Sequence, residues 1–89
     1  MKPVFFSFSF KRAFKKRIAG QKALEEKFWQ RVEIFTNDPF DPRLRTHKLS
    51  GKLNELWSFS FAYDLRVVFY FLPQNRVMFE NIGTHDEVY

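Results

Sequence analysis

The chain of 89 residues has room for one domain, because two separate cores of half this length would each bury too little apolar surface. Its composition, 45% hydrophobic and 20% aromatic with thirteen Phe, excludes intrinsic disorder. The absence of Cys excludes disulfides, thiolate zinc sites and cysteine nucleophiles, and it leaves a cytoplasmic location unopposed. No apolar stretch approaches the roughly 18 to 20 residues of a membrane span. We therefore expect a single domain over residues 1–89 without a membrane segment.

The net charge of +5 is concentrated near the N-terminus. Residues 1–31 hold nine basic and two acidic side chains, whereas the rest of the chain is slightly acidic. The densest run of cations comprises Lys11, Arg12, Lys15, Lys16 and Arg17. A concentrated cationic surface attracts polyanions and releases counterions from nucleic acid, so RNA, DNA or an acidic protein segment fits it. The alternative interpretation is an ordinary solvated helix face.

The first predicted elements are a short strand and an amphipathic helix. Residues 3–8 are aromatic and β-branched, which favours a strand. Ser7 or Ser9 can then cap a helix. Across residues 10–18 the apolar side chains recur at spacings of three and four, and Gly20 supplies a stop signal.

A second helix and a basic loop follow. The apolar stripe of this helix comprises Leu24, Phe28, Val32 and Phe35. The helix ends before Pro39, because proline disfavours helical backbone in the preceding residue. Residues 38–52 have no sustained period and carry several cations, Arg45, Lys48 and Lys52 among them.

Three strands complete the chain. Residues 57–63 alternate aromatic and small side chains, which predicts a half-buried strand. Residues 66–72 form a nearly continuous apolar run, and a turn at 73–75 leads into a last strand at 76–82. The order β-α-α-β-β-β predicts an α+β fold in which a helical hairpin packs on a small antiparallel or mixed sheet.

The candidate catalytic residues are His47, in the basic loop, and His85, near the C-terminus. Imidazole accepts and donates protons near neutral pH, and such help accelerates reactions by roughly 10² to 10⁴. Cleavage of RNA by its own 2′-hydroxyl needs a proton acceptor, a proton donor and a cation for the phosphorus centre, and Arg66 suits the last role. Two ordinary surface histidines are the alternative.

Other chemistry has little support in the sequence. The two histidines with Asp86 and Glu87 lack the close spacing of metal ligands, and the glycines are isolated, so no metal, nucleotide or small-molecule cofactor is predicted. Trp29 and Trp57 are expected in the core with the phenylalanines. Tyr89 either stacks on an RNA base or covers the edge of the sheet.

Several segments together resemble the RelE/ParE superfamily of toxins from bacterial type II toxin–antitoxin operons. The resemblance covers the whole chain and is strongest to the YafQ-like, RelE/StbE-type branch, through His47-Lys48-Leu49 and Gly83-Thr84-His85. The other matching segments are residues 10–16, Asp38-Pro39, residues 49–53, Trp57-Ser58, residues 63–69 and residues 82–89.

The resemblance implies a ribosome-dependent mRNA endonuclease that cuts in the decoding site and is neutralised by a cognate antitoxin. It assigns catalysis to His85, His47, Asp64, Arg66 and Tyr89. RNA or ribosome contacts fall to the N-terminal cations named above and to Arg45, Lys48 and Lys52.

Two positions depart from the YafQ-like pattern, which has a cation where Asn81 stands and a histidine where Ser60 stands. Two other functions therefore stay open. ParE-type members of the superfamily poison DNA gyrase, and a toxin without its chemistry is an inert module that binds RNA or antitoxin.

Overall fold

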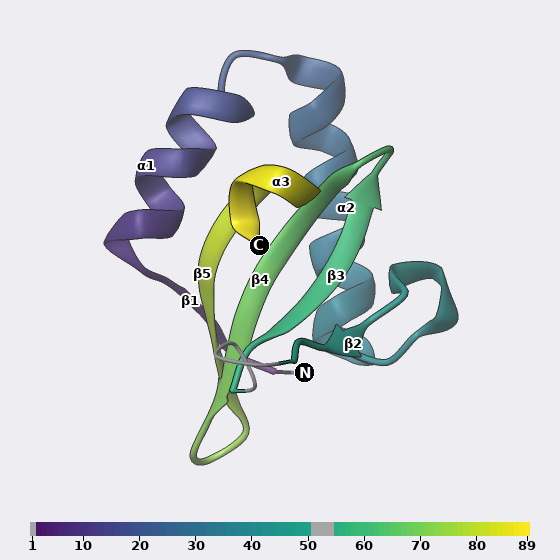
Figure 1. Cartoon of the computed structure of the whole chain (residues 1–89). Helices are drawn as coiled ribbons and strands as arrows, with labels where there is room; N and C mark the ends of the chain where they lie inside the picture. The colour runs from purple at the N-terminus through teal and green to yellow at the C-terminus, as the bar shows by residue number, and fades with distance from the viewer. Residues whose placement is uncertain (1, 51–54) are drawn as a thin grey trace.

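The predicted α+β fold is confirmed by a computed structural model, which describes residues 2–50 and 55–89 (Figure 1). In the described residues the elements are β1 (Val4–Phe6), α1 (Phe8–Arg17), α2 (Lys22–Asn37), the 3-10 turn η1 (Pro42–Leu44), β2 (His47–Lys48), β3 (Trp57–Ala62), β4 (Leu65–Leu72), β5 (Arg76–Thr84) and α3 (His85–Val88). None of the described helices is both long and apolar enough to cross a membrane.

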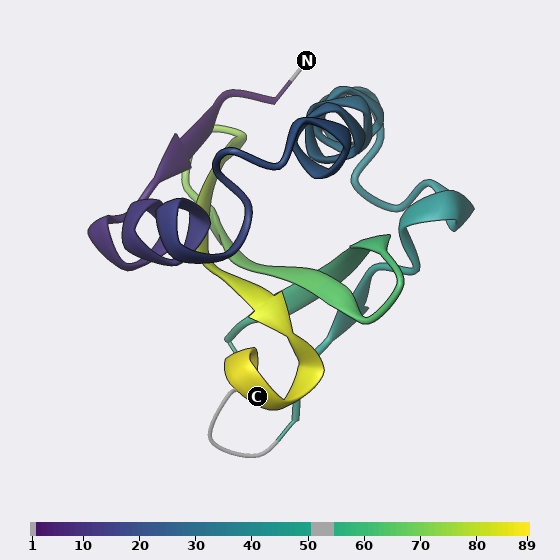
Figure 2. The same cartoon turned by 90° about the horizontal axis from the view of Figure 1, so that it is seen from above.

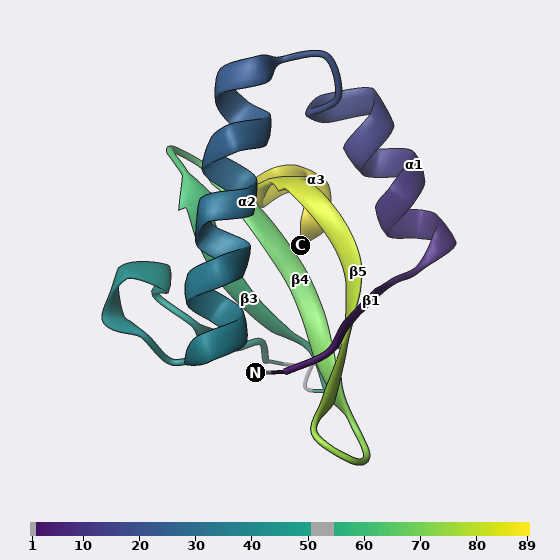
Figure 3. The same ribbon diagram turned by 180° about the vertical axis from the view of Figure 1, so that it is seen from behind.

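The five described strands form one mixed sheet in the order β1-β5-β4-β3-β2. Strand β1 runs parallel to β5, with Val4 opposite Val77, and the other neighbours are antiparallel. Figure 2 shows α1 and α2 on one side of this sheet and α3 on the other. Because α1 directly follows β1, the parallel pair places this cationic helix beside β5, which leads into the C-terminal α3. Figure 3 shows the same arrangement from behind, with α2 lying across the sheet.

The start of α1 is fixed by the predicted cap. The hydroxyl oxygen of Ser7 accepts a hydrogen bond from the backbone N–H of Phe10 at 3.0 Å, which satisfies one donor of the first turn. The helix therefore begins at Phe8, two residues before the first predicted position, and ends at Arg17. Gly20 has a φ of +86° in the turn between the helices, a conformation that suits glycine.

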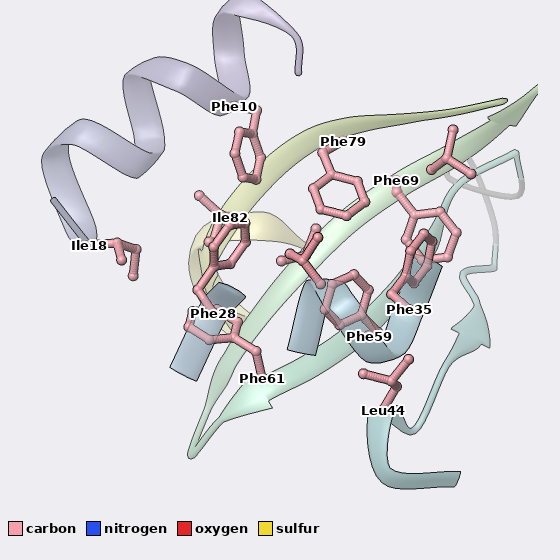
Figure 4. Packing of buried hydrophobic residues seen from close by; sticks show 13 residues of the cluster. Phe10, Ile18, Phe28, Phe35, Leu44, Phe59, Phe61, Phe69, Phe79 and Ile82 are labelled. Carbon is pink, nitrogen blue, oxygen red and sulfur yellow. The ribbon is translucent and has the colours of Figure 1, made fainter. Parts of the chain in front are cut away.

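The predicted helical stripes and strands enclose an aromatic core (Figure 4). Phe79 of β5 lies at its centre, fully buried. Its ring centroid lies between 5.4 and 6.5 Å from the centroids of six other rings, those of Phe6, Phe10, Phe28, Phe35, Phe59 and Phe69. Edge-to-face and tilted pairs of this kind add to the area that the rings bury.

Several aromatic side chains depart from the expected burial, the exposed Phe5, Phe8 and Phe40 among them. Trp29 is 50% exposed, because it projects from α2 beside the buried stripe rather than from it. Tyr63 is 97% exposed, since β3 ends at Ala62 and the next residue lies in the turn to β4. The prediction of a strand over residues 57–63 was therefore one residue too long.

The segment expected to be a basic loop also contains regular structure. Residues 42–44 form η1, and His47 and Lys48 form the edge strand β2, opposite Ser58 and Trp57 of β3. A strand of two residues has no sequence period of its own, so only its pairing with β3 defines it.

Asp41 holds the start of η1 through Arg43. Its Oδ1 accepts hydrogen bonds from the backbone N–H and from Nε of Arg43, both at 2.9 Å, and Oδ2 accepts one from Nη2 at 2.9 Å. These hydrogen bonds lower the pKa of Asp41 from 3.8 to about 2. A lowered pKa in the folded protein means that the ionised side chain stabilises the fold above the unfolded pKa and loses this contribution as the pH falls through about 2.

We expect Asp41→Asn to lower the melting temperature at neutral pH, because Asn keeps the backbone cap but loses the charged partner of Arg43. The difference from the original chain should narrow as the pH falls from 3.8 toward 2, where Asp41 itself becomes protonated. Thermal melts followed by circular dichroism across this range test the prediction. A difference that stays constant with pH would contradict it.

Candidate active site

The two histidines and the terminal tyrosine line one pocket of about 380 Å³, although His47 lies 38 residues before His85 in the sequence. His47 comes from the edge strand β2, and His85 and Tyr89 come from α3 and its end. Lys48 also lines this pocket. The sheet brings these residues together, because α3 lies on the face opposite the large helices (Figure 2).

The contacts of His47 define which of its ring nitrogens carries the proton in the neutral form. Its Nδ1 lies 3.1 Å from the carbonyl oxygen of Arg45, which can only accept. Nδ1 therefore donates, and Nε2 is left as an acceptor 3.4 Å from the hydroxyl of Tyr89. This arrangement gives His47 a fixed orientation and a proton-accepting nitrogen directed into the pocket.

His85 begins α3 and is more open to solvent. Its side chain is 53% exposed, and its Nδ1 lies 3.5 Å from Oδ1 of the fully exposed Asp86. The Tyr89 ring lies edge-on to His85 with centroids 4.3 Å apart, and edge-on to His47 with centroids 6.5 Å apart. Tyr89 is thus packed between the two imidazoles while 37% of it stays exposed.

Glu87 holds the short helix that carries His85. Its Oε1 accepts a hydrogen bond from the backbone N–H of Thr84 at 2.8 Å, as in a capping box, and its Oε2 forms an ion pair with Arg17 at the end of α1. Gly83 makes room for this, since a Cβ there would lie 2.8 Å from Glu87 Oε1. The Thr-x-x-Glu pattern of residues 84–87 is the sequence signal for this cap.

We expect Glu87→Ala to loosen α3, because the Thr84 amide and Arg17 lose their shared partner. Hydrogen exchange of the Thr84 amide should accelerate, and the NMR signals of His85 should move toward those of an unstructured peptide. Asp86→Ala removes a neighbouring exposed carboxylate that makes neither contact, so it is the control. Equal exchange rates for the two variants would contradict the assigned role of Glu87.

Arg66 and Asp64, expected in the same site, line a second pocket together with Arg45. In the register of β4 and β5, Arg66 stands opposite Gly83, and Gly83 lies two residues before His85 in the sequence. Its Nη1 donates to the hydroxyl of Ser60 at 2.9 Å. The structure therefore separates the predicted catalytic residues into a histidine pocket and a neighbouring cationic pocket.

The predicted RNA-binding cations occupy three places. Lys11, Arg12, Lys15 and Lys16 are exposed on α1, while Arg17 of the same helix pairs with Glu87. Lys48 lies in the histidine pocket and Arg45 in the cationic pocket. Lys52 lies outside the described residues. Among the residues that are described, no three His, Asp or Glu side chains gather as a metal site.

Asn81 and Ser60, the two departures from the YafQ-like pattern, have local partners. The side-chain oxygen of Asn81 accepts a hydrogen bond from the backbone N–H of Ile82 at 2.9 Å. Ser60 accepts from Arg66, as described above. Neither side chain supplies the missing cation or imidazole, and the cations nearby are Lys48, which lines the pocket of His85, and Arg66, which pairs with Gly83.

Comparisons with known proteins identify relatives of this fold. No family model and no curated protein sequence matches the chain. Among solved structures, a metal-bound toxin from Helicobacter pylori is 22% identical with a TM-score of 0.80, and the match covers 100% of both chains. The YoeB/ParE toxin from Agrobacterium tumefaciens is 17% identical with a TM-score of 0.78, covering 96% of this chain and 99% of that one.

A third similar structure comes from the DinJ-YafQ toxin-antitoxin complex of Escherichia coli. It is 19% identical with a TM-score of 0.67, over 99% of this chain and 97% of that one. The chain thus has the fold of RelE/ParE-like toxins along its whole length, as its sequence predicts.

Proposed function

We propose that the chain is the toxin of a type II toxin–antitoxin system and cuts mRNA on the ribosome. The observation that carries this proposal is the pocket in which His47, His85 and Tyr89 meet on the fold of such toxins. Two imidazoles and one aromatic ring at an open surface pocket suit a reaction that moves two protons beside a nucleotide base.

The reaction is transesterification by the 2′-hydroxyl of the RNA. As its oxygen attacks the adjacent phosphorus, the hydroxyl gives up a proton, and the departing 5′-oxygen gains one, which leaves a cyclic phosphate and a free 5′-hydroxyl. His85 is the main proton-transfer group and His47 is the second. The unprotonated Nε2 of His47, which faces the Tyr89 hydroxyl, suits the acceptor role, and His85 in its protonated form then suits the donor role.

Cations stabilise the extra negative charge of the five-coordinate phosphorus. Arg66 has this role, supported by its place opposite Gly83, close in sequence to His85. Lys48 in the histidine pocket and Lys52 position the neighbouring phosphates, and Asp64 lines the cationic pocket together with Arg66. Tyr89 stacks on a base once the RNA enters, which requires its ring to turn away from His85.

The exposed cations of α1 contact the ribosomal RNA backbone. Helix α1 adjoins α3 through the Arg17–Glu87 ion pair, so binding along α1 brings the histidine pocket against the ribosome. Binding to ribosomes should weaken steeply as salt rises, because each phosphate contact releases counterions. A flat salt response would count against this contact.

The partner that neutralises the chain is a cognate antitoxin. The similar fold in the DinJ-YafQ toxin-antitoxin complex supports this part of the proposal. The net charge of +5 fits an acidic, flexible partner in the cytoplasm that docks on the cationic surface.

Induced expression in bacteria, with radiolabelled precursors, tests the function. Because mRNA cleavage removes the templates of translation, methionine incorporation should stop before thymidine incorporation does. If thymidine incorporation stops first and a DNA-damage response follows, the chain is a gyrase poison instead. If neither stops, it is an inert binding module. If translation stops first, co-expression of the partner antitoxin should restore growth.

A further inference from the structure

A second pocket, of about 530 Å³, lies beside the histidine pocket and is strongly cationic. Helix α2, the η1 segment and strand β4 each contribute to its lining. Five basic side chains line it, Lys27, Arg31, Arg43, Arg45 and Arg66. Asp64 is the one carboxylate among the described residues of its wall. Such an excess of one charge in a concave surface focuses the electrostatic field and concentrates anions there.

Some of these guanidinium groups have fixed positions. Arg31 donates from Nη1 to the carbonyl oxygen of Arg43 at 2.9 Å, and Arg43 is held by Asp41. Arg66 donates from Nη1 to Ser60, but its Nε is buried and has no hydrogen-bond partner among the described residues. An unpaired buried donor is unfavourable, so Arg66 stands in the pocket wall without its full set of hydrogen bonds.

The cationic pocket is joined to the histidine pocket at two points. The carbonyl oxygen of Arg45, whose side chain lines the cationic pocket, accepts the hydrogen bond that orients His47. Arg66 stands opposite Gly83, two residues before His85. One extended polyanion can therefore pass from one pocket to the other.

We propose that the cationic pocket binds a phosphate of the RNA strand next to the bond that is cut, so that the strand runs from the Lys27 side of α2 past Arg45 to the two histidines. This rests on the proposed function. Four of the five cations are arginines, whose planar forks match phosphate oxygens. The adjacent histidine pocket favours RNA over an acidic protein segment.

The test uses a fluorescent single-stranded RNA in which every 2′-hydroxyl is methylated, so that it binds but cannot be cut. Lys27→Ala removes an exposed pocket cation, and Arg45→Asn removes another while Asn tolerates the φ of 53° at this position. Lys22→Ala removes an exposed cation from the same helix outside the pocket and is the matched control. Circular dichroism establishes that each variant folds.

We expect Lys27→Ala and Arg45→Asn each to weaken binding several-fold and to reduce the slope of log affinity against log salt by about 0.7, the value for one single-strand phosphate contact. The Lys22→Ala control should leave the slope unchanged. Equal slopes in all variants would overturn the proposal. So would stronger displacement of the RNA by an acidic peptide than by unlabelled RNA, or displacement by inorganic phosphate with no effect of the variants.

Because this RNA cannot react, the salt slope is independent of cleavage. A slope that depends on Lys27 and Arg45 in a chain that cuts no mRNA would contradict the proposed function and leave the phosphate pocket standing. If the chain cuts mRNA but the salt slopes are equal in all variants, the phosphate pocket is contradicted and the proposed function stands.

Discussion

We expect His85→Ala to lower the rate of mRNA cleavage by about 10² to 10⁴, the usual contribution of a positioned acid or base. The loss falls on the chemical step, because the imidazole exchanges a proton with the RNA only as the phosphorus is attacked. His85 is half exposed at the first position of α3, so its removal leaves the core intact. Single-turnover cleavage in a translation extract measures the rate.

The control for this experiment is Asp86→Ala, which removes the exposed neighbour of His85 and should keep most of the activity. His47→Ala should also reduce the rate strongly, because we propose that His47 makes the second proton transfer. Full activity in a well-folded His85→Ala protein would remove His85 from the mechanism. Unchanged ribosome binding by this variant would show that its loss lies in chemistry.

We expect Phe79→Ala to cost about 3 to 5 kcal/mol of unfolding free energy, as large-to-small changes of buried aromatics do. Phe79 is fully buried and lies within 6.5 Å, centroid to centroid, of six rings from both helices and three strands. Its removal leaves a cavity that these rings cannot all close. Domains of this size have a free energy of unfolding of about 5 to 15 kcal/mol in total, so the loss is a large share of the stability.

Urea denaturation measures this loss, with Phe8→Ala as the control because Phe8 is 84% exposed. The control should change stability by about 0.5 kcal/mol or less. Where Phe79→Ala fails to fold, Phe79→Leu gives a smaller cavity and a measurable transition. A cost below about 1 kcal/mol for Phe79→Ala would contradict the central place of Phe79 in the core.

Periodicity in the sequence predicts those helices and strands whose apolar residues recur at the spacing of one buried face. The stripe of α2 was predicted from its spacing, and Phe28, Val32 and Phe35 are buried as expected. Side-chain chemistry predicted a cap at Ser7 or Ser9, and Ser7 forms it. The exposure of Trp29 was not predicted. Tryptophan counts as apolar in the composition, but the position of a residue around the helix decides whether its side chain faces the sheet.

Long-range pairing sets the features that the sequence did not predict. The parallel pairing of β1 with β5 joins residues 73 apart and places α1 beside β5, where Arg17 forms an ion pair with Glu87. The two-residue strand β2 exists through its partner. The cationic pocket likewise combines Lys27 with Arg66, which no spacing along the chain connects.

The prediction of the candidate site rests on residue types and on the resemblance. The structure brings His47, His85 and Tyr89 into one pocket and places Arg66 and Asp64 in the adjacent one. These residues were candidates from the sequence because imidazole and guanidinium groups suit the chemistry of RNA cleavage. The sequence could not predict which of them share a pocket, because this follows from the strand order and from α3 folding back over the sheet.

Primer extension on a defined mRNA in a bacterial translation extract tests the proposed activity most directly. The purified chain is added to one reaction with ribosomes and to a parallel reaction without them. We expect cuts in phase with codons, and only where ribosomes are present, because in the proposed mechanism the ribosome holds the mRNA across the histidine and cationic pockets. Cuts in both reactions, or in neither, would contradict a ribosome-dependent endonuclease.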